Sequence, residues 1–200
     1  MRLVCLTALF FSAVLFCSAA GAHESDGAGG TPSTVSPDLR YSYGWGYFSG
    51  DLSDSASRPV HDFQISLLKV RSNESGFHGF LSINVLTTSA VHTGTRFPFA
   101  PGSSLDILAF LFIPHVCSGH LEPMNFCFGI GQGTFNVNAN QDRRDFGTWN
   151  YQLLAEIPIS ENATIHALGK YIGQIEQTVG GAYSRFGMTS VAIGLGWDWR

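Results

Sequence analysis

The feature that most constrains this chain is a repeated two-residue alternation between apolar and small or polar side chains. In residues 39–47, leucine, tyrosine or tryptophan takes every odd position, and arginine, serine or glycine takes every even one. Successive side chains of a β-strand point to opposite faces, so this segment has one apolar face and one small or polar face. The pattern recurs, with isolated exceptions, in residues 62–67, 77–85, 148–157, 164–171 and 190–199.

Two further segments bring the expected strands to eight. Residues 104–114 are apolar on both faces apart from Asp106, and residues 125–136 carry Phe126, Phe128 and Ile130 on one face. An even number of strands closes a meander without an open edge, which a lipid environment requires. Most of the segments approach the roughly 9–11 residues that a tilted strand needs to cross a bilayer. The sequence therefore predicts an all-β domain over residues 39–200, an eight-stranded antiparallel up-and-down transmembrane β-barrel.

The composition of the polar face favours a barrel in a membrane over a soluble one. A secreted soluble β-barrel or β-sandwich binding protein is the alternative, and its polar face would be rich in lysine and glutamate. Here glycine, serine, threonine, asparagine and glutamine dominate that face, and charged residues make up 13% of the chain, about half the usual share. Such a face is typical of the filled interior of a small barrel, which leaves no room for a wide pore.

The N-terminal residues have the parts of a secretory signal peptide. A positive charge at Arg2 precedes an apolar run over residues 3–16, and a small-residue site ends at Ala22. The run is short for a membrane anchor, and Phe16 before Cys17 does not fit a lipoprotein site. We expect residues 1–22 to be a cleaved signal peptide, residues 23–38 a flexible tail, and the mature chain to reach the bacterial outer membrane.

The connections also follow an outer-membrane pattern. Residues 72–75 and 160–162 are short turns on one side, whereas the loops after the first, third, fifth and seventh strands are expected to be longer. Cys117 and Cys127 flank the remaining turn on the side of the short ones. They are the only cysteines after the signal peptide, and an exported chain meets an oxidising compartment. We predict a disulfide between them, with two free thiols as the alternative.

Residues 192–199, Ala-Ile-Gly-Leu-Gly-Trp-Asp-Trp, resemble the C-terminal assembly signal of outer-membrane barrels. Gly194, Trp197 and Trp199 match that signal, whereas Ala192 stands at a usually polar position and Arg200 follows the terminal aromatic. The chain as a whole resembles the class of small eight-stranded bacterial outer-membrane β-barrel proteins. The resemblance implies outer-membrane lipid and the barrel-assembly machinery as partners, and a monomer.

Some eight-stranded barrels of this class modify lipid A, as deacylases or acyltransferases. The His-x-Ser-Asn element of the deacylases is absent, because Ala167 and Leu168 follow His166. The best catalytic candidates are His166, Ser190 and Glu156, which fall on the interior face of neighbouring strands. We expect these three polar groups to satisfy one another instead.

Other polar residues have a plainer interpretation. His115, His120 and Glu122 match no metal-ligand spacing and are expected to form a polar turn. The net charge of −4 and the absence of a basic cluster argue against a nucleic-acid partner, and no motif indicates a cofactor or a metal. Five charged residues share the inward parity and are expected to pair there. They are Arg40, Asp62, Asp106, Glu156 and Lys170.

These observations predict an outer-membrane barrel with a structural or surface-interaction role that is neither an enzyme nor a wide pore. The lipid A-modifying enzyme stays as the alternative function.

Overall fold

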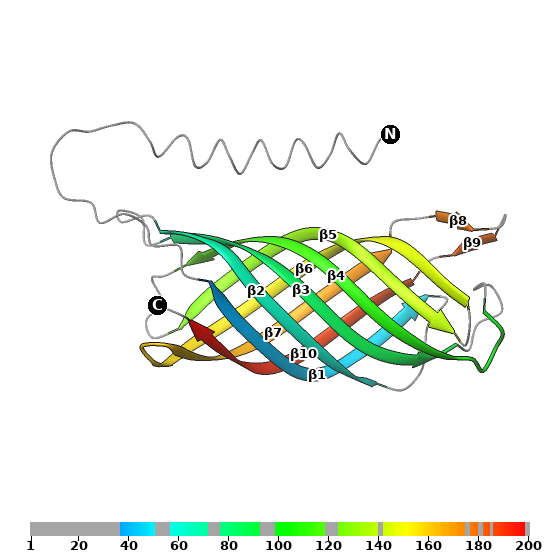
Figure 1. The fold of residues 1–200 in the computed structure, drawn as a ribbon, viewed down its shortest axis with the longest axis horizontal. Coiled ribbons are helices and arrows are strands. Elements are labelled where there is room, and N and C mark those ends of the chain that lie inside the picture. Colours follow the sequence, from blue (N-terminus) through cyan, green and yellow to red (C-terminus); the bar gives the residue numbers. More distant parts are fainter. Residues whose placement is uncertain are drawn as a thin grey trace, which may run out of the picture. The chain divides into compact units, whose positions relative to one another are not determined.

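Eight strands of the described chain form a closed antiparallel barrel, which confirms the predicted fold (Figure 1). The computed structural model describes residues 37–50, 57–71, 77–92, 99–118, 124–139, 142–174, 177–179, 182–184 and 186–198. The barrel strands are β1 (Asp38–Gly50), β2 (Arg58–Arg71), β3 (Phe77–Val91), β4 (Ser104–Ser118), β5 (Asn125–Ala139), β6 (Asp142–Ser160), β7 (Ala163–Gln174) and β10 (Phe186–Asp198). The expected signal peptide and nearly all of the expected tail lie outside the described residues.

Every barrel strand pairs with the next barrel strand along the chain, and β10 returns to pair with β1. A short hairpin that the sequence did not predict, β8 (Gln177–Val179) with β9 (Ala182–Ser184), lies within the β7–β10 connection. We call the end where β1 begins and β10 ends the terminal rim, and the opposite end the distal rim. Among the described residues, no helix is long and apolar enough to cross a membrane.

The seam between β1 and β10 runs from Asp38 opposite Asp198 to Gly50 opposite Phe186. Trp197 lies opposite Leu39 at the terminal rim, and Trp199 lies outside the described residues. Gly194 lies opposite Ser42 on β1 and opposite His166 on β7. A Cβ at this position would lie 2.1 Å from the backbone oxygen of Tyr41 and 2.6 Å from Nε2 of His166. The glycine of the assembly-signal resemblance is therefore required by packing at the seam.

The barrel is apolar outside and closed inside. Ile193 and Leu195 on the outer wall are 69% and 62% exposed, whereas Gln152 is 1% exposed. The predicted orientation is thus confirmed for Leu153 and Leu195, which face outward, and for Gln152 and Glu156, which face the interior. We call the exposed apolar side chains of the outer wall the apolar band. It comprises Tyr41, Tyr43, Trp45, Tyr47, Phe63, Ile65, Leu67, Ile83, Phe110, Phe112, Val116, Phe126, Phe128, Tyr151, Leu153, Ile157, Ile159, Ile165, Tyr171, Val191, Ile193, Leu195 and Trp197.

The expected long loop after the fifth strand is wrong. Residues 125–136 and 148–157 were predicted as strands, but β5 continues to Ala139 and β6 begins at Asp142, with paired residues almost to the tip. The exposed residues of this extension, Asn138, Arg143 and Asp145 among them, are polar because it projects beyond the apolar band. A hairpin that is polar on its outer face has the composition of a loop.

Two further residues differ from their predicted positions. His115 is not in a polar turn, because β4 continues through Pro114 and places the histidine ring inside the barrel, stacked 4.2 Å from Phe80. His120 and Glu122 lie outside the described residues. Asp106 does not face inward. Its neighbours Leu105 and Ile107 are buried, while Asp106 is exposed on the outer wall. Where the other strands alternate, their polar positions face the interior, whereas in β4 the polar position Asp106 faces outward.

Candidate functional site

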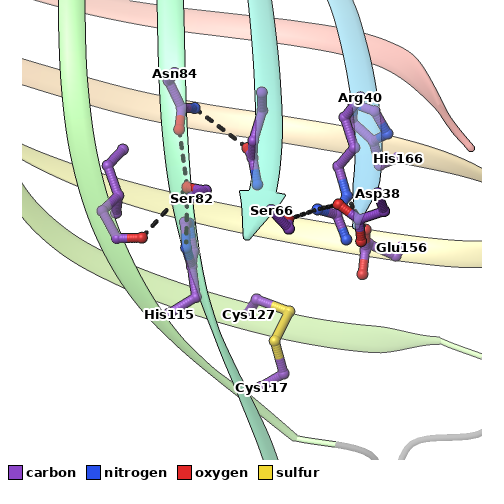
Figure 2. Close-up of polar contacts among 12 residues, drawn as sticks. Asp38, Arg40, Ser66, Ser82, Asn84, His115, Cys117, Cys127, Glu156 and His166 are labelled. Carbon is purple, nitrogen blue, oxygen red and sulfur yellow. Dashed lines mark hydrogen bonds and ion pairs between the residues drawn. A yellow bond between two sulfur atoms is a disulfide. The ribbon is translucent and has the colours of Figure 1, made fainter. Parts of the chain in front are cut away.

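The interior near the terminal rim is organised around Arg40. Its Nη1 lies 2.7 Å from Oδ1 of Asp38 and its Nε lies 2.7 Å from Oε1 of Glu156. Nη1 also donates to Oγ of Ser66 at 2.7 Å. Figure 2 shows Arg40 pointing into this group from β1. All three charged side chains are almost fully buried, so the charges are stabilised by one another rather than by water.

Arg40 and Glu156 lie on β1 and β6, which β10 and β7 separate in the barrel, so their side chains meet across the interior. β10 lies between β1 and β7, and Gly196 on it pairs directly with Arg40. A Cβ at Gly196 would lie 3.3 Å from Cγ of Arg40. The glycines of β10 therefore leave space for long side chains of the neighbouring strands to cross the interior.

A second polar group fills the middle of the barrel. Lys170 forms a buried ion pair with Asp62. Beside it, Nδ2 of Asn84 donates to Oε1 of Gln64 and to Oε1 of Gln152, each at 3.2 Å. Because buried polar groups are stable only when paired, this network is a structural plug. Together with the group around Arg40, it pairs four of the five charges that the sequence assigned to the interior, with Asp106 the exception.

Toward the distal rim the interior is apolar. Phe186 packs against Phe135 and Phe146, with ring centroids 5.2 Å apart in both pairs. Phe99, from the chain between β3 and β4, is buried in the same cluster. Together with the polar network, these side chains fill the barrel, as an eight-stranded barrel of this size requires.

Cys117 and Cys127 lie directly opposite each other on β4 and β5 and form a disulfide inside the barrel. Both cysteines are fully buried, against Phe80 and Leu154, and Figure 2 shows the bond between their sulfur atoms. The bond closes a loop with a sequence separation of 10 residues. It therefore ties together the two strands that flank the β4–β5 turn.

We expect the unreduced, denatured mature protein to expose no thiols to a labelling reagent and to expose two after reduction. In the chain-entropy model, a loop of this length stabilises the fold by roughly 2–3 kcal/mol. Mass spectrometry of the labelled protein measures the number of thiols. Two reactive thiols before reduction would contradict the disulfide.

The three catalytic candidates do not meet. His166 lies opposite Glu156 in the β6–β7 register, but that carboxylate binds Arg40 instead. Ser190 lies opposite Lys170. It is four residues along β10 from Gly194, the residue opposite His166, which corresponds to about 13 Å at 3.3 Å per residue. The expectation that these three groups satisfy one another is therefore wrong.

The partner of His166 is a residue that the sequence did not single out. Nε2 of His166 and Oγ of Ser42 are joined by a hydrogen bond of 2.7 Å across Gly194. Nδ1 of His166 is buried and has no hydrogen-bond partner in the described chain. A nucleophilic serine needs a histidine that a third group orients, so this buried pair lacks one part of a hydrolase site. The sequence feature that could have indicated this pair is Gly194 on β10, which lies between Ser42 on β1 and His166 on β7.

The comparisons with known proteins identify structural relatives only. No model of a protein family matches the sequence, and no curated protein matches it. Neisserial surface protein A has a TM-score of 0.61 at 9% identity, over 82% of this chain and 97% of that one. Ail, the attachment invasion locus protein of Yersinia pestis, gives 0.52 at 10% identity, over 82% and 99%.

The outer membrane protein AlkL, determined in lipid bilayers, gives a TM-score of 0.53 at 10% identity, over 89% of this chain and 96% of that one. Identities of this size carry no information about shared activity. The likeness covers nearly the whole of each barrel, and it agrees with the closed eight-stranded topology and the apolar outer wall described above. This chain has the fold of the small eight-stranded outer-membrane β-barrels.

Proposed function

We propose that this protein is exported, sits in the bacterial outer membrane as a monomeric barrel, and acts there through structure or surface contact. The observation that carries the proposal is the inverted barrel, with an apolar band outside and an interior filled by ion pairs, hydrogen bonds and aromatic rings. An apolar outer wall of this extent is stable in lipid and is a liability in water. A filled interior excludes a wide pore.

The position of the exposed polar residues on the outer wall supports a role at the cell surface. Exposed polar residues line the outer wall of the distal half, on β5 and β6 at Thr134, Asn138, Arg143 and Asp145. Two of the similar structures bear names that refer to the cell surface, a surface protein and an attachment invasion locus protein. The distal end is therefore the part that we expect to meet an external partner.

A pair of outward arginine substitutions on β10 tests the membrane location. We expect Ile193→Arg to reduce folded protein in the membrane fraction strongly, because an arginine near the bilayer midplane costs about 2–4 kcal/mol. Thr189→Arg, on the same face but toward the distal rim, is the matched control and should cost about 0–1 kcal/mol. Heat-dependent gel migration of membrane fractions measures folding. Equal tolerance of the two substitutions would favour a soluble barrel, because both positions are exposed.

The alternative function, a lipid A-modifying enzyme, makes a different prediction. Because His166 is buried and its Nδ1 is not oriented by a carboxylate, we expect lipid A to be the same in cells with and without the protein. Mass spectra of extracted lipid A measure the acyl-chain number. A change that disappears in His166→Ala, while that variant still folds by gel migration, would assign the protein to the enzyme class.

A further inference from the structure

The outer wall of the barrel carries a groove near the distal rim. It has a volume of about 390 Å³ and crosses β2, β3, β4 and β5, which is within the usual range for small-ligand sites. Its outward-facing lining includes Asp106, the charged residue that the sequence assigned to the interior. The lining side chains that matter below are His61, Thr87, Ser89, Asp106, Leu108 and Asn138.

The strand register arranges the outward residues of this wall in three rows. The row closest to the distal rim is polar and consists of Ser89, Asp106 and Asn138. Ser89 lies opposite Asp106, and Asp106 lies opposite Asn138. The next row is mixed and consists of His61, Thr87 and Leu108. The third row, toward the middle of the barrel, is apolar and consists of Phe63, Val85 and Phe110. Polarity therefore falls steadily along the wall, as it does along an amphiphile.

The polar groups of the groove are available to a ligand. In the described chain, the side chains of Thr87, Ser89, Asp106 and Asn138 have no hydrogen bond or ion pair to other residues. His61, in contrast, is held in place by a 2.8 Å hydrogen bond between its Nδ1 and Oη of Tyr41. The groove thus offers free hydroxyl, carboxylate and amide groups beside a fixed imidazole ring.

The side chains that line the groove favour some lipid headgroups over others. Among the described residues that line the groove there is no lysine or arginine, and the carboxylate of Asp106 repels anions, so a phosphate is disfavoured. Hydroxyl, amide and carboxylate groups together match the many hydroxyls of a sugar. We propose that the groove binds the sugar headgroup of a glycolipid in the outer leaflet, with the acyl chains along Phe63, Val85 and Phe110. The proposal rests on the outer-membrane location argued above.

The test uses the full mature chain in dodecylphosphocholine micelles, with gel migration as the check that the barrel has formed. Dodecyl maltoside, which has the same alkyl chain and a sugar headgroup, is then added, and backbone amide shifts are followed by NMR. We expect saturable shifts at Ser89, Asp106 and Asn138. Free maltose at the same concentration should produce none, because it lacks the chain that lies on the apolar row.

Asp106→Ala should weaken the dodecyl maltoside titration about tenfold, as the loss of a hydrogen bond to a charged group predicts. Asp145→Ala is the matched control, since Asp145 is an exposed aspartate on the neighbouring β6 and does not line the groove. A folded barrel without saturable shifts, with equal effects of the two variants, or with the same shifts from free maltose, overturns the glycolipid site alone. A chain that forms no barrel in micelles overturns the membrane location, and this site with it.

Discussion

Deletion of residues 197–200 is expected to leave almost no folded barrel in the membrane. The deletion removes Trp197 and Asp198 from their pairing with Leu39 and Asp38 at the seam, and with them a backbone hydrogen bond from Asp198 N to Asn162 O of 2.9 Å. An open seam in lipid leaves backbone groups unpaired, at several kcal/mol each. The deletion also removes both aromatic residues that resemble the assembly signal.

The measurement is the amount of heat-modifiable protein in membrane fractions. Removal of residues 177–184, the β8–β9 hairpin, serves as the control, because that hairpin pairs only with itself in the described chain. We expect the control deletion to insert. Wild-type levels of folded protein after the terminal deletion would contradict a closed barrel with its seam at β1 and β10.

Replacement of Arg40 by methionine is expected to destabilise the barrel by about 3–5 kcal/mol. The substitution keeps much of the side-chain volume but removes an ion-pair partner from two buried carboxylates, Asp38 and Glu156. Unfolding by urea in lipid vesicles, followed by tryptophan fluorescence, measures the change. The free energy of unfolding should recover in part when Glu156→Gln is added, because the buried side chain at position 156 then carries no charge that needs Arg40.

Arg143 provides a matched control for this prediction. It is paired with Asp145 at 3.3 Å, but its side chain is 66% exposed and that of Asp145 is 58% exposed. Exposed ion pairs contribute about 0–1 kcal/mol, so Arg143→Met should change stability little. If Arg40→Met and Arg143→Met had the same free energy of unfolding, the buried ion pairs of Arg40 would not be what stabilises the terminal end of the barrel.

Much of the architecture follows from local pattern. The alternation in residues 39–47 predicts a strand with one apolar face, and the glycine, serine and asparagine of the other face predict that the apolar face points outward. Both expectations are confirmed by the exposure of Tyr43 and the burial of Ser42. A period of two residues is a property of the chain itself, so it can be read without knowing any neighbour.

The strand ends were harder to predict where the outer wall stops being apolar. Asn138, Arg143 and Asp145 have the composition of a loop, yet they belong to a continuous hairpin of β5 and β6. Their strand conformation depends on pairing across the hairpin. The strand that contains Asp106 is apolar on both faces, so its sequence has no alternation that shows which side faces outward. Only the closed barrel shows that Asp106 faces outward.

The sequence by itself determined the eight barrel strands and, wherever apolar and polar residues alternate, the face that each strand turns outward, because this pattern depends on neighbours one or two positions away. Only the tertiary structure decided which interior side chains meet. His166 binds Ser42, 124 positions earlier, rather than Ser190. Glu156 binds Arg40 rather than the histidine opposite it. These contacts depend on the stagger between strands when the barrel closes and on glycines that let long side chains cross a strand, and neither is set by the local pattern.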